Sequence, residues 1–251
     1  MITRQQFVAF IDEKLGSARI KDYCPNGLQV EGKAEIQRIV FGVTANQALV
    51  DAAVSLKADA LIVHHGYFWR GEDPRIIGMK HRRLASLLRA DINLYGYHLP
   101  LDWHPELGNN AQLAVLLGWE AEGRFGEQDI GWYGKPLDLE PLTLAGLEQR
   151  LAITLQRPPL VIGVAEQPIR RLAWCSGGAQ SYFEAAIALG VDAFITGEIS
   201  EPMVHLARES GVAYLACGHH ATERFGVQAL SAHLQTKFNF DCQFVDIASP
   251  V

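Results

Sequence analysis

Residues 39–66 read IVFGVTANQALVDAAVSLKADALIVHHG, and the pattern of this stretch decides the fold. An apolar run at 39–43 is followed by helical spacing over about 45–57 and by a second apolar run at 58–63. A further helix, HRRLASLLRAD, and a further strand, INLYGY, continue the alternation. Strands that alternate with helices predict a parallel or mixed sheet covered by helices on both faces, which is an α/β fold.

The later chain repeats this order. Residues 172–199 align with 39–66 without a gap, at an offset of 133 residues (172 − 39), and the alignment matches Asp59 with Asp192. The patterning that all βαβ segments share is an alternative explanation of this likeness.

A second match favours two related α/β halves. At an offset of 121 residues, NLYGYHLPLD from residue 93 lies over YLACGHHATE from residue 214. This alignment puts His98 on His219 and Asp102 on Glu223, so that each half ends a buried strand with a histidine and, four residues later, a carboxylate. A period this long argues against a solenoid.

The repeat predicts two domains, a first α/β domain over 1–122 and a second over 123–251. The stretch of about 119–170 is rich in glycine and proline and reads as a connector that contains one helix over 144–155. We expect the C-terminal helix and strand to pack on the first domain.

Composition excludes several classes of function. The chain has 251 residues, with 22 Lys and Arg against 28 Asp and Glu, which gives a formal net charge of −6. Bulk charge therefore makes nucleic-acid binding unlikely. Apolar runs are too short to span a membrane, and the N-terminus lacks the layout of a signal peptide, so we expect a cytoplasmic protein. The four cysteines form no CxxC pair and are expected to be reduced thiols.

Unusual polar residues follow three predicted strands, at the edge where α/β sheets bind ligands. His64 and His65 follow one strand, Asp102 a second, and His219 with Glu223 a third. Mixed imidazole and carboxylate ligation suits Zn, Fe, Mn, Co or Ni. Five donors exceed what one open tetrahedral ion needs and suit two divalent ions, which can share a bridging carboxylate and activate a water. Taken alone, the two histidines could instead close a strand through hydrogen bonds.

Two further residues are candidates for catalysis. His98 could carry protons, ligate a metal or hold a ligand carboxylate, and we favour the first or the last of these roles. Glu198, at the repeat position of His65, could act as a general base or cap the helix that begins near Ser200. The aromatic and basic residues at 67–70 and 80–83 could bind a base and phosphates, or form a lid or subunit contact followed by a solvated helix start.

Several spaced motifs resemble the Nif-three-like dinuclear-metal-binding family, and in particular its bacterial YbgI type. They occur in one order along essentially the whole chain: DYCPNGLQVEG, GVTA, ADALIVHHG, YHLPLD, HPELGNNAQLA, DAFITGE and GHHATER. The resemblance implies that the metal ligands are His64, His65, Asp102, His219 and Glu223. It also implies two α/β domains with the metal pair in the crevice between them, and a toroidal homohexamer.

Members of this family are often named GTP cyclohydrolase I type 2 homologues, which implies attack of metal-activated water on a nucleotide-like small-molecule substrate. We therefore expect a metal-dependent hydrolase. A metal-dependent phosphoesterase is an alternative, because metal ligands alone do not identify the bond that is cleaved. A metal-binding scaffold or regulatory ring protein without turnover is another. A DNA-related function would need a ring with a basic inner face, and composition does not reveal the charge of such a face.

Overall fold

The computed structural model describes residues 2–137 and 140–251, and the chain divides into two compact units. Unit 1 contains the chain up to Gly108 together with Gly226–Ala248, and unit 2 contains Asn109–Phe225 with Ser249–Val251. This division differs from the predicted boundary at 122 and 123. Residues 109–122 belong to unit 2 because buried side chains of this segment, such as those of Leu113 and Trp119, pack in its core.

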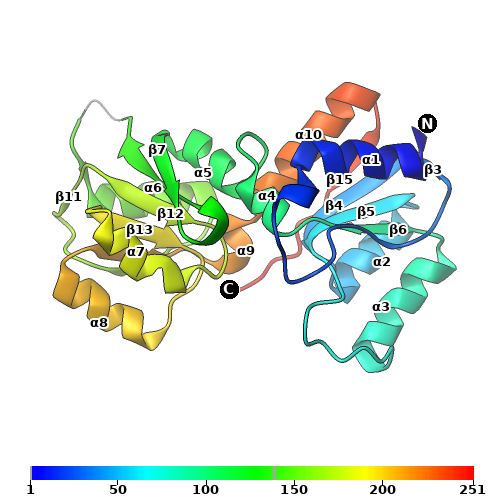
Figure 1. Ribbon diagram of the computed structural model, residues 1–251, viewed down its shortest axis with the longest axis horizontal. Coiled ribbons are helices and arrows are strands. Elements are labelled where there is room, and N and C mark those ends of the chain that lie inside the picture. The colour runs from blue at the N-terminus through cyan, green and yellow to red at the C-terminus, as the bar shows by residue number, and fades with distance from the viewer. Residues whose placement is uncertain (1, 138–139) are drawn as a thin grey trace. The chain divides into compact units, whose positions relative to one another are not determined.

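A five-stranded sheet forms the centre of unit 1 (Figure 1). In spatial order the strands are β15 (Asp241–Phe244), β4 (Arg38–Thr44), β5 (Ala60–His65), β6 (Asn93–Gly96) and β2 (Gly27–Val30). The strands from β15 to β6 run parallel, and β2, at one edge, is antiparallel to β6. A separate two-stranded ladder joins β1 (Ile2–Thr3) to β3 (Glu35–Ile36).

Helices cover both faces of this sheet, as the alternation of strands and helices predicts. The helices of unit 1 are α1 (Arg4–Leu15), η1 (Ser17–Arg19), α2 (Gln47–Ser55), α3 (Gly78–Arg89), α4 (Leu99–Trp103) and α10 (Arg224–Phe238), whose first two residues belong to unit 2. Successive residues of β4 point to opposite faces, so Phe41 packs in a cluster with side chains of α1 and α10, and Val40 packs in a cluster with side chains of α2 and α3. The C-terminal helix and strand thus pack in unit 1, as expected.

Unit 2 is built around a six-stranded mixed sheet. In spatial order its strands are β10 (Leu160–Ile162), β14 (Ala213–Ala216), β13 (Ala193–Thr196), β12 (Leu172–Cys175), β8 (Gly131–Pro136) and β7 (Trp119–Phe125). The central three strands are parallel and the outer three join antiparallel. A short ladder pairs β9 (Leu142–Thr143) with β11 (Pro168–Ile169).

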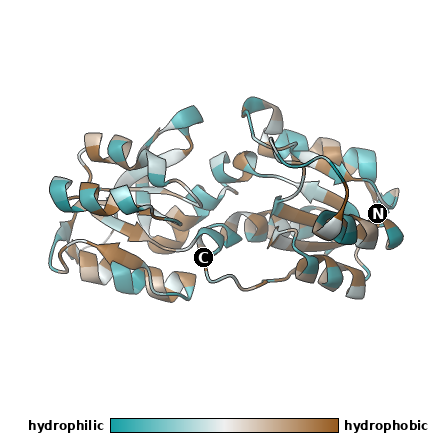
Figure 2. Cartoon of the chain, turned by 90° about the horizontal axis from the view of Figure 1, so that it is seen from below, coloured by the Kyte–Doolittle hydropathy of each residue, from teal (hydrophilic) through white to brown (hydrophobic). Residues whose placement is uncertain are grey.

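Two buried clusters lie on the two faces of this second sheet. One contains side chains of α5 (Asn109–Leu117) and α6 (Leu144–Leu155), and the other contains side chains of α7 (Phe183–Ala188) and α8 (Glu201–Ser210). The remaining helical segments of the unit are η2 (Glu127–Asp129), η3 (Gln180–Tyr182) and α9 (His219–Thr222). In both units the sheet strands are predominantly hydrophobic, and hydrophilic residues lie on the outer faces of the helices (Figure 2).

The segment 119–170 is not a connector, contrary to the prediction. It supplies β7, β8 and β10 to the sheet, although the helix predicted over 144–155 is confirmed as α6.

Glycines in β7 and β8 have a packing role. A Cβ at Gly134 would overlap the backbone carbonyl of Glu120 on the adjacent strand, and a Cβ at Gly123 would overlap the Tyr133 ring. These glycines therefore permit close approach within a ladder, which the sequence does not distinguish from flexibility.

The strand registers support the internal repeat. Ile39 pairs with Ala60 in unit 1 and Leu172 pairs with Ala193 in unit 2, so the two ladders are related by the same offset of 133 residues. The offset predicted for the third strand of each unit is wrong by one residue. Tyr95 and Leu215 occupy equivalent positions beside β5 and β13, and they differ by 120 rather than 121 residues (215 − 95).

The strand register therefore aligns His98 with Gly218 instead of with His219. Gly218, with a φ of 99°, is the additional residue before the histidine of unit 2. His98 and His219 follow equivalent strands but occupy different positions in the turns after those strands.

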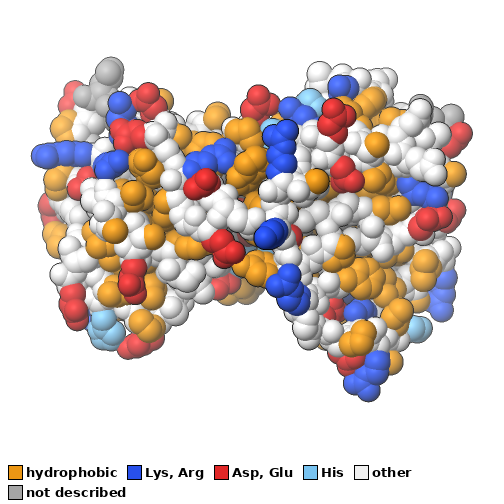
Figure 3. Space-filling view, viewed as in Figure 1, with side chains coloured by type: hydrophobic (Ala, Val, Ile, Leu, Met, Phe, Trp, Pro, Cys, Tyr) orange, Lys and Arg blue, Asp and Glu red, His pale blue; other side chains and the backbone are white. Residues whose placement is uncertain are grey.

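Charged side chains of both signs lie on one face of the molecule. On the face drawn in Figure 3, Lys and Arg side chains are interspersed with Asp and Glu side chains. Within the described residues, no helix has both the length and the hydropathy needed to cross a membrane.

Candidate metal centre

The predicted site residues follow the carboxyl ends of parallel strands in both units. In unit 1, His64 and His65 end β5, His98 follows β6 and Asp102 lies on α4. In unit 2, Glu198 follows β13, and His219 and Glu223 lie at the two ends of the α9 turn that follows β14. Each unit therefore places imidazoles and carboxylates at the sheet edge where α/β folds bind ligands.

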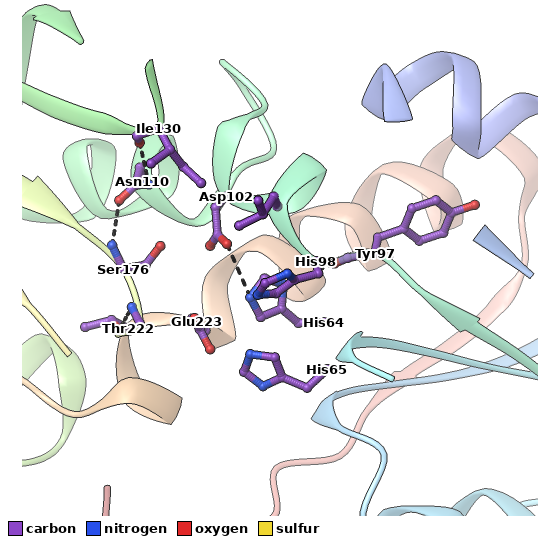
Figure 4. A network of polar contacts seen from close by, with 12 residues as sticks. His64, His65, Tyr97, His98, Asp102, Asn110, Ile130, Ser176, Thr222 and Glu223 are labelled. Carbon is purple, nitrogen blue, oxygen red and sulfur yellow. Dashed lines mark hydrogen bonds and ion pairs between the residues drawn. The ribbon is translucent and has the colours of Figure 1, made fainter. Parts of the chain in front are cut away.

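His64 is held between a backbone carbonyl and a carboxylate. Its Nδ1 donates to the carbonyl oxygen of Tyr97 at 3.0 Å, and its Nε2 lies 3.4 Å from Oδ2 of Asp102 (Figure 4). Both side chains are buried. Because the carbonyl can only accept, Nδ1 carries a proton and Nε2 is the ring nitrogen that faces the carboxylate. A cation between Nε2 and Oδ2 could therefore be bound by both groups.

His65 lies beside His64 although the two are consecutive in a strand. Their ring centroids are 4.5 Å apart, and Nδ1 of His65 is 3.1 Å from Oγ1 of Thr44. The strand β5 includes both histidines and ends at His65. The next residue, Gly66, is required for space, since a Cβ there would overlap the side-chain amide of Gln29.

His98 is anchored by a residue that sequence reasoning did not select. Its Nδ1 lies 2.7 Å from Oδ1 of Asp22, and its backbone N–H donates to Oδ1 of Asn26 at 2.8 Å. Burial alone would raise the pKa of Asp22, but the hydrogen bond and charge of His98, with bonds from Asn26 and Leu99, lower it to about 2. The DYCPNG motif contains Asp22 and Asn26, but the pattern does not reveal their partner.

In unit 2 the His219 ring lies between two carboxylates. Nδ1 is 2.7 Å from Oε1 of Glu198, and Nε2 is 3.1 Å from Oε2 of the buried Glu223. Burial would lower the pKa of His219, but Glu223 and then Glu198 raise it to about 9. The surroundings of this imidazole therefore strongly favour a positive charge. Glu198 contacts His219 instead of capping α8, where Ser200 is the N-cap residue.

The turn formed by Ser176, Gly177 and Gly178 in unit 2 leaves space for the side chains of His219 and Glu223. Its sequence does not match a phosphate-binding loop. A Cβ at Gly177 would overlap the carboxylate of Glu223 and approach Nε2 of His219 to 3.2 Å. The turn is fixed by two bonds: Ser176 N–H donates to Asn110 Oδ1 at 2.9 Å, and Gly177 N–H donates to Thr222 Oγ1 at 3.0 Å (Figure 4).

The donor chemistry of both units suits a borderline divalent ion. Imidazoles and carboxylates predominate, and His64, His65 and His98 each offer a ligand atom within 4.8 Å of the others. Cys24 is near Asp22 and His98, but burial and the charge of Asp22 raise the pKa of its thiol to about 12. The cysteine is thus a poor thiolate ligand at neutral pH, in keeping with the free thiols found for all four cysteines.

The whole chain is similar to solved structures of the same fold. The structure of protein ybgI, described as a protein of unknown function, has a TM-score of 0.95 and 52% sequence identity and covers 100% of both chains. The structure of TTHA1606 from Thermus thermophilus has a TM-score of 0.89 and 33% identity, again with 100% of both chains covered.

Sequence comparison gives the same relationship. Proteins named GTP cyclohydrolase 1 type 2 homolog are 54% identical over 246 residues in Pseudomonas aeruginosa and 56% identical over 242 residues in Escherichia coli K12, with 95% and 96% of each chain covered. A family model described as Duf34/NIF3 (NGG1p interacting factor 3) matches residues 2–250. Because this match spans nearly the entire sequence and the relatives are more than half identical, the chain belongs to the DUF34/NIF3 family.

Proposed function

We propose that this protein is a hydrolase that depends on two divalent metal ions and acts on a nucleotide-like substrate. One repeated observation carries the proposal: each unit pairs an imidazole Nε2 with a carboxylate at a strand end. The distances are 3.4 Å for His64 and Asp102 in unit 1 and 3.1 Å for His219 and Glu223 in unit 2. In both pairs Nδ1 is held by an oxygen acceptor, as is usual for histidines that bind metals.

In this proposal the ions are held by the five side chains that the sequence predicted, His64, His65, Asp102, His219 and Glu223. The donor set fits Zn, Fe, Mn, Co or Ni. Divalent ions bound in such sites lower the pKa of water and stabilise developing negative charge on a substrate.

The remaining polar residues position these donors. Tyr97 and Glu198 accept the Nδ1 protons of His64 and His219, which fixes the tautomer in which Nε2 binds a cation. Glu198 thus acts through His219, and we assign it a positioning role in place of the general base considered from sequence.

Two observations support a nucleotide-like substrate. The relatives above are named as homologues of a GTP cyclohydrolase. In unit 1, Phe68 follows His65 by three residues and is 37% exposed. An exposed aromatic ring is suited to stacking on a base.

The proposal is tested by metal content followed by turnover. Untagged protein, purified without chelators, is analysed by elemental mass spectrometry, and we expect two ions per chain. GTP, other nucleotides and phosphoesters are then screened with each metal restored. A chain that holds no metal after reconstitution would contradict the proposal. Two bound ions without turnover of any substrate would instead favour the metal-binding scaffold.

We also propose that the chain assembles as the toroidal homohexamer that the family resemblance implies. Light scattering coupled to size-exclusion chromatography should give six chain masses. A monomeric mass across the working concentration range would contradict this assembly without affecting the metal ligands.

A further inference from the structure

The three histidines of unit 1 form one cluster. Their ring centroids are 4.5 Å apart for His64 and His65, 5.1 Å for His64 and His98, and 5.6 Å for His65 and His98 (Figure 4). One ligand atom from each lies within 4.8 Å of the other two. Because all three residues belong to unit 1, this cluster does not depend on any donor from unit 2.

The Nδ1 atom of His98 is held in the same way as that of one predicted metal ligand, His219. A carboxylate holds its Nδ1 at 2.7 Å, just as Glu198 holds Nδ1 of His219 at 2.7 Å. A carboxylate accepts and does not donate, so Nδ1 of His98 carries a proton and Nε2 is the nitrogen that would supply a lone pair to a bound cation. A carboxylate on the far nitrogen is the common outer partner of a metal-binding histidine, since it fixes the ring and raises its basicity.

Asp22 is itself held rigidly. Besides His98, its carboxylate accepts the backbone N–H of Leu99 at 2.9 Å and the side-chain amide of Asn26 at 2.9 Å. Its oxygens are thereby committed to orienting His98 and the start of α4, which makes Asp22 a poor metal ligand. The neighbouring group of Asp22, Cys24 and His98 is therefore better described as support for the His98 ring than as a cation site.

Another buried histidine of the same unit shows the contrast. Nε2 of His104 donates to the carbonyl of Lys14 at 2.9 Å, and its Nδ1 accepts the backbone N–H groups of Glu106 and Leu107. Both ring nitrogens of His104 are thus used in holding the backbone. His98 differs because its ring is oriented by a carboxylate toward two other imidazoles.

We infer that His98 is a sixth metal donor, and that His64, His65 and His98 together form a three-imidazole subsite able to hold one ion within unit 1 alone. The inference rests on the proposed function and extends it, because the five predicted ligands do not include His98. Three neutral imidazoles favour Zn²⁺, Co²⁺ or Ni²⁺ over Mg²⁺ or Ca²⁺, which prefer oxygen donors. Asp22 is the positioning residue of this subsite.

The test removes the donors of unit 2 and asks what remains. In the full chain, the double variant His219→Ala, Glu223→Gln is dialysed against Zn²⁺ or Co²⁺ and its bound metal is counted by elemental analysis. We expect one ion per chain, with a visible Co²⁺ absorption band that reports its ligands. Adding His98→Gln should weaken that binding at least 10-fold, and adding Asp22→Asn should weaken it by about 10- to 100-fold.

Controls separate this inference from the proposed function. His205→Gln changes an exposed histidine of unit 2 and should leave binding unchanged. Circular dichroism establishes that each variant is folded. If the wild type binds two ions but the double variant binds none, or binds one regardless of His98, the subsite is overturned while the dinuclear site stands. If the folded wild type binds no metal at all, the proposed function and this subsite both fail.

Discussion

Asp59 and Asp192 make the same pair of hydrogen bonds at positions 133 residues apart. In each, one carboxylate oxygen accepts two consecutive backbone N–H groups, those of Gln37 and Arg38 at 3.1 and 2.8 Å in unit 1 and those of Arg170 and Arg171 at 2.7 and 2.9 Å in unit 2. The two units therefore share a specific side-chain contact as well as strand order, which shared βαβ patterning alone would not require.

We expect Asp59→Ala to lower the free energy of unfolding by about 1–2 kcal/mol at pH 7, because two backbone N–H groups lose a charged acceptor. Burial alone would raise the pKa of Asp59, but the bonds from Arg38, Lys33 and Gln37 lower it. The stabilisation is thus present above the ordinary pKa of about 4 and is lost as the pH falls through the lowered value.

Urea denaturation at pH 7 and near pH 3 measures this difference. The gap between wild type and Asp59→Ala should shrink at the lower pH. Asp192→Ala is the matched variant in unit 2 and should also be destabilised at pH 7. An equal gap for Asp59→Ala at both pH values would show that its charge does not stabilise the fold.

Glu223→Gln should remove at least one metal ion per chain and leave the fold intact. The substitution keeps the shape of a buried side chain but replaces a carboxylate with a weaker neutral donor. Elemental mass spectrometry gives the metal content, and circular dichroism gives the fold. Full metal occupancy in this variant would refute Glu223 as a ligand.

Glu198→Ala should weaken metal binding by about 10- to 100-fold through the loss of the partner that holds His219. A similar pair elsewhere provides the control, because Glu201 lies 2.7 Å from Nε2 of His205 on the exposed surface of α8. Glu201→Ala should not change metal affinity in a competition titration with a chromogenic chelator. Equal effects of the two variants would argue against a role of Glu198 at the centre.

Gly177→Ala should disrupt the centre of unit 2 because the new Cβ would overlap the carboxylate of Glu223. Gly190→Ala separates this effect from backbone strain. Both glycines have a φ of 68°, but a Cβ at Gly190 meets nothing within 4 Å. Each variant should lose about 1 kcal/mol of stability from the left-handed backbone. Only Gly177→Ala should also lose metal, and retained metal would mean that Glu223 can move aside.

The fold was largely predictable because both units bury continuous apolar strands. The pattern of 39–66 gave the strands that became β4 and β5, and the motifs gave the family, which the comparisons confirm. The sequence did not identify β7 and β8, where glycines serve close packing within a ladder. Nor did it place residues 109–122 in unit 2, because that boundary depends on tertiary contacts that local patterns do not encode.

The candidate site was predictable only in part. Residues that follow strands could be named, since strand ends converge at one edge of a sheet. The contacts of Asp22 with His98 and of Glu198 with His219 span 76 and 21 residues along the chain. Pairings of this kind depend on the fold, so Asp22 was missed and Glu198 was expected to act as a base or a cap. Metal ligation by the five predicted residues stays a prediction.

The path of the chain also governs when unit 1 can be completed. The outer edge of β4 pairs with β15, which is made of Asp241–Phe244 near the end of the chain. A chain growing from its N-terminus therefore acquires every strand of unit 2 before it acquires the last strand of unit 1. Until then, β4 displays unpaired backbone groups of the kind that recruit foreign strands. The sheet of the unit that is synthesised first is thus completed after the sheet of unit 2, and the edge of β4 stays unpaired until β15 has been synthesised.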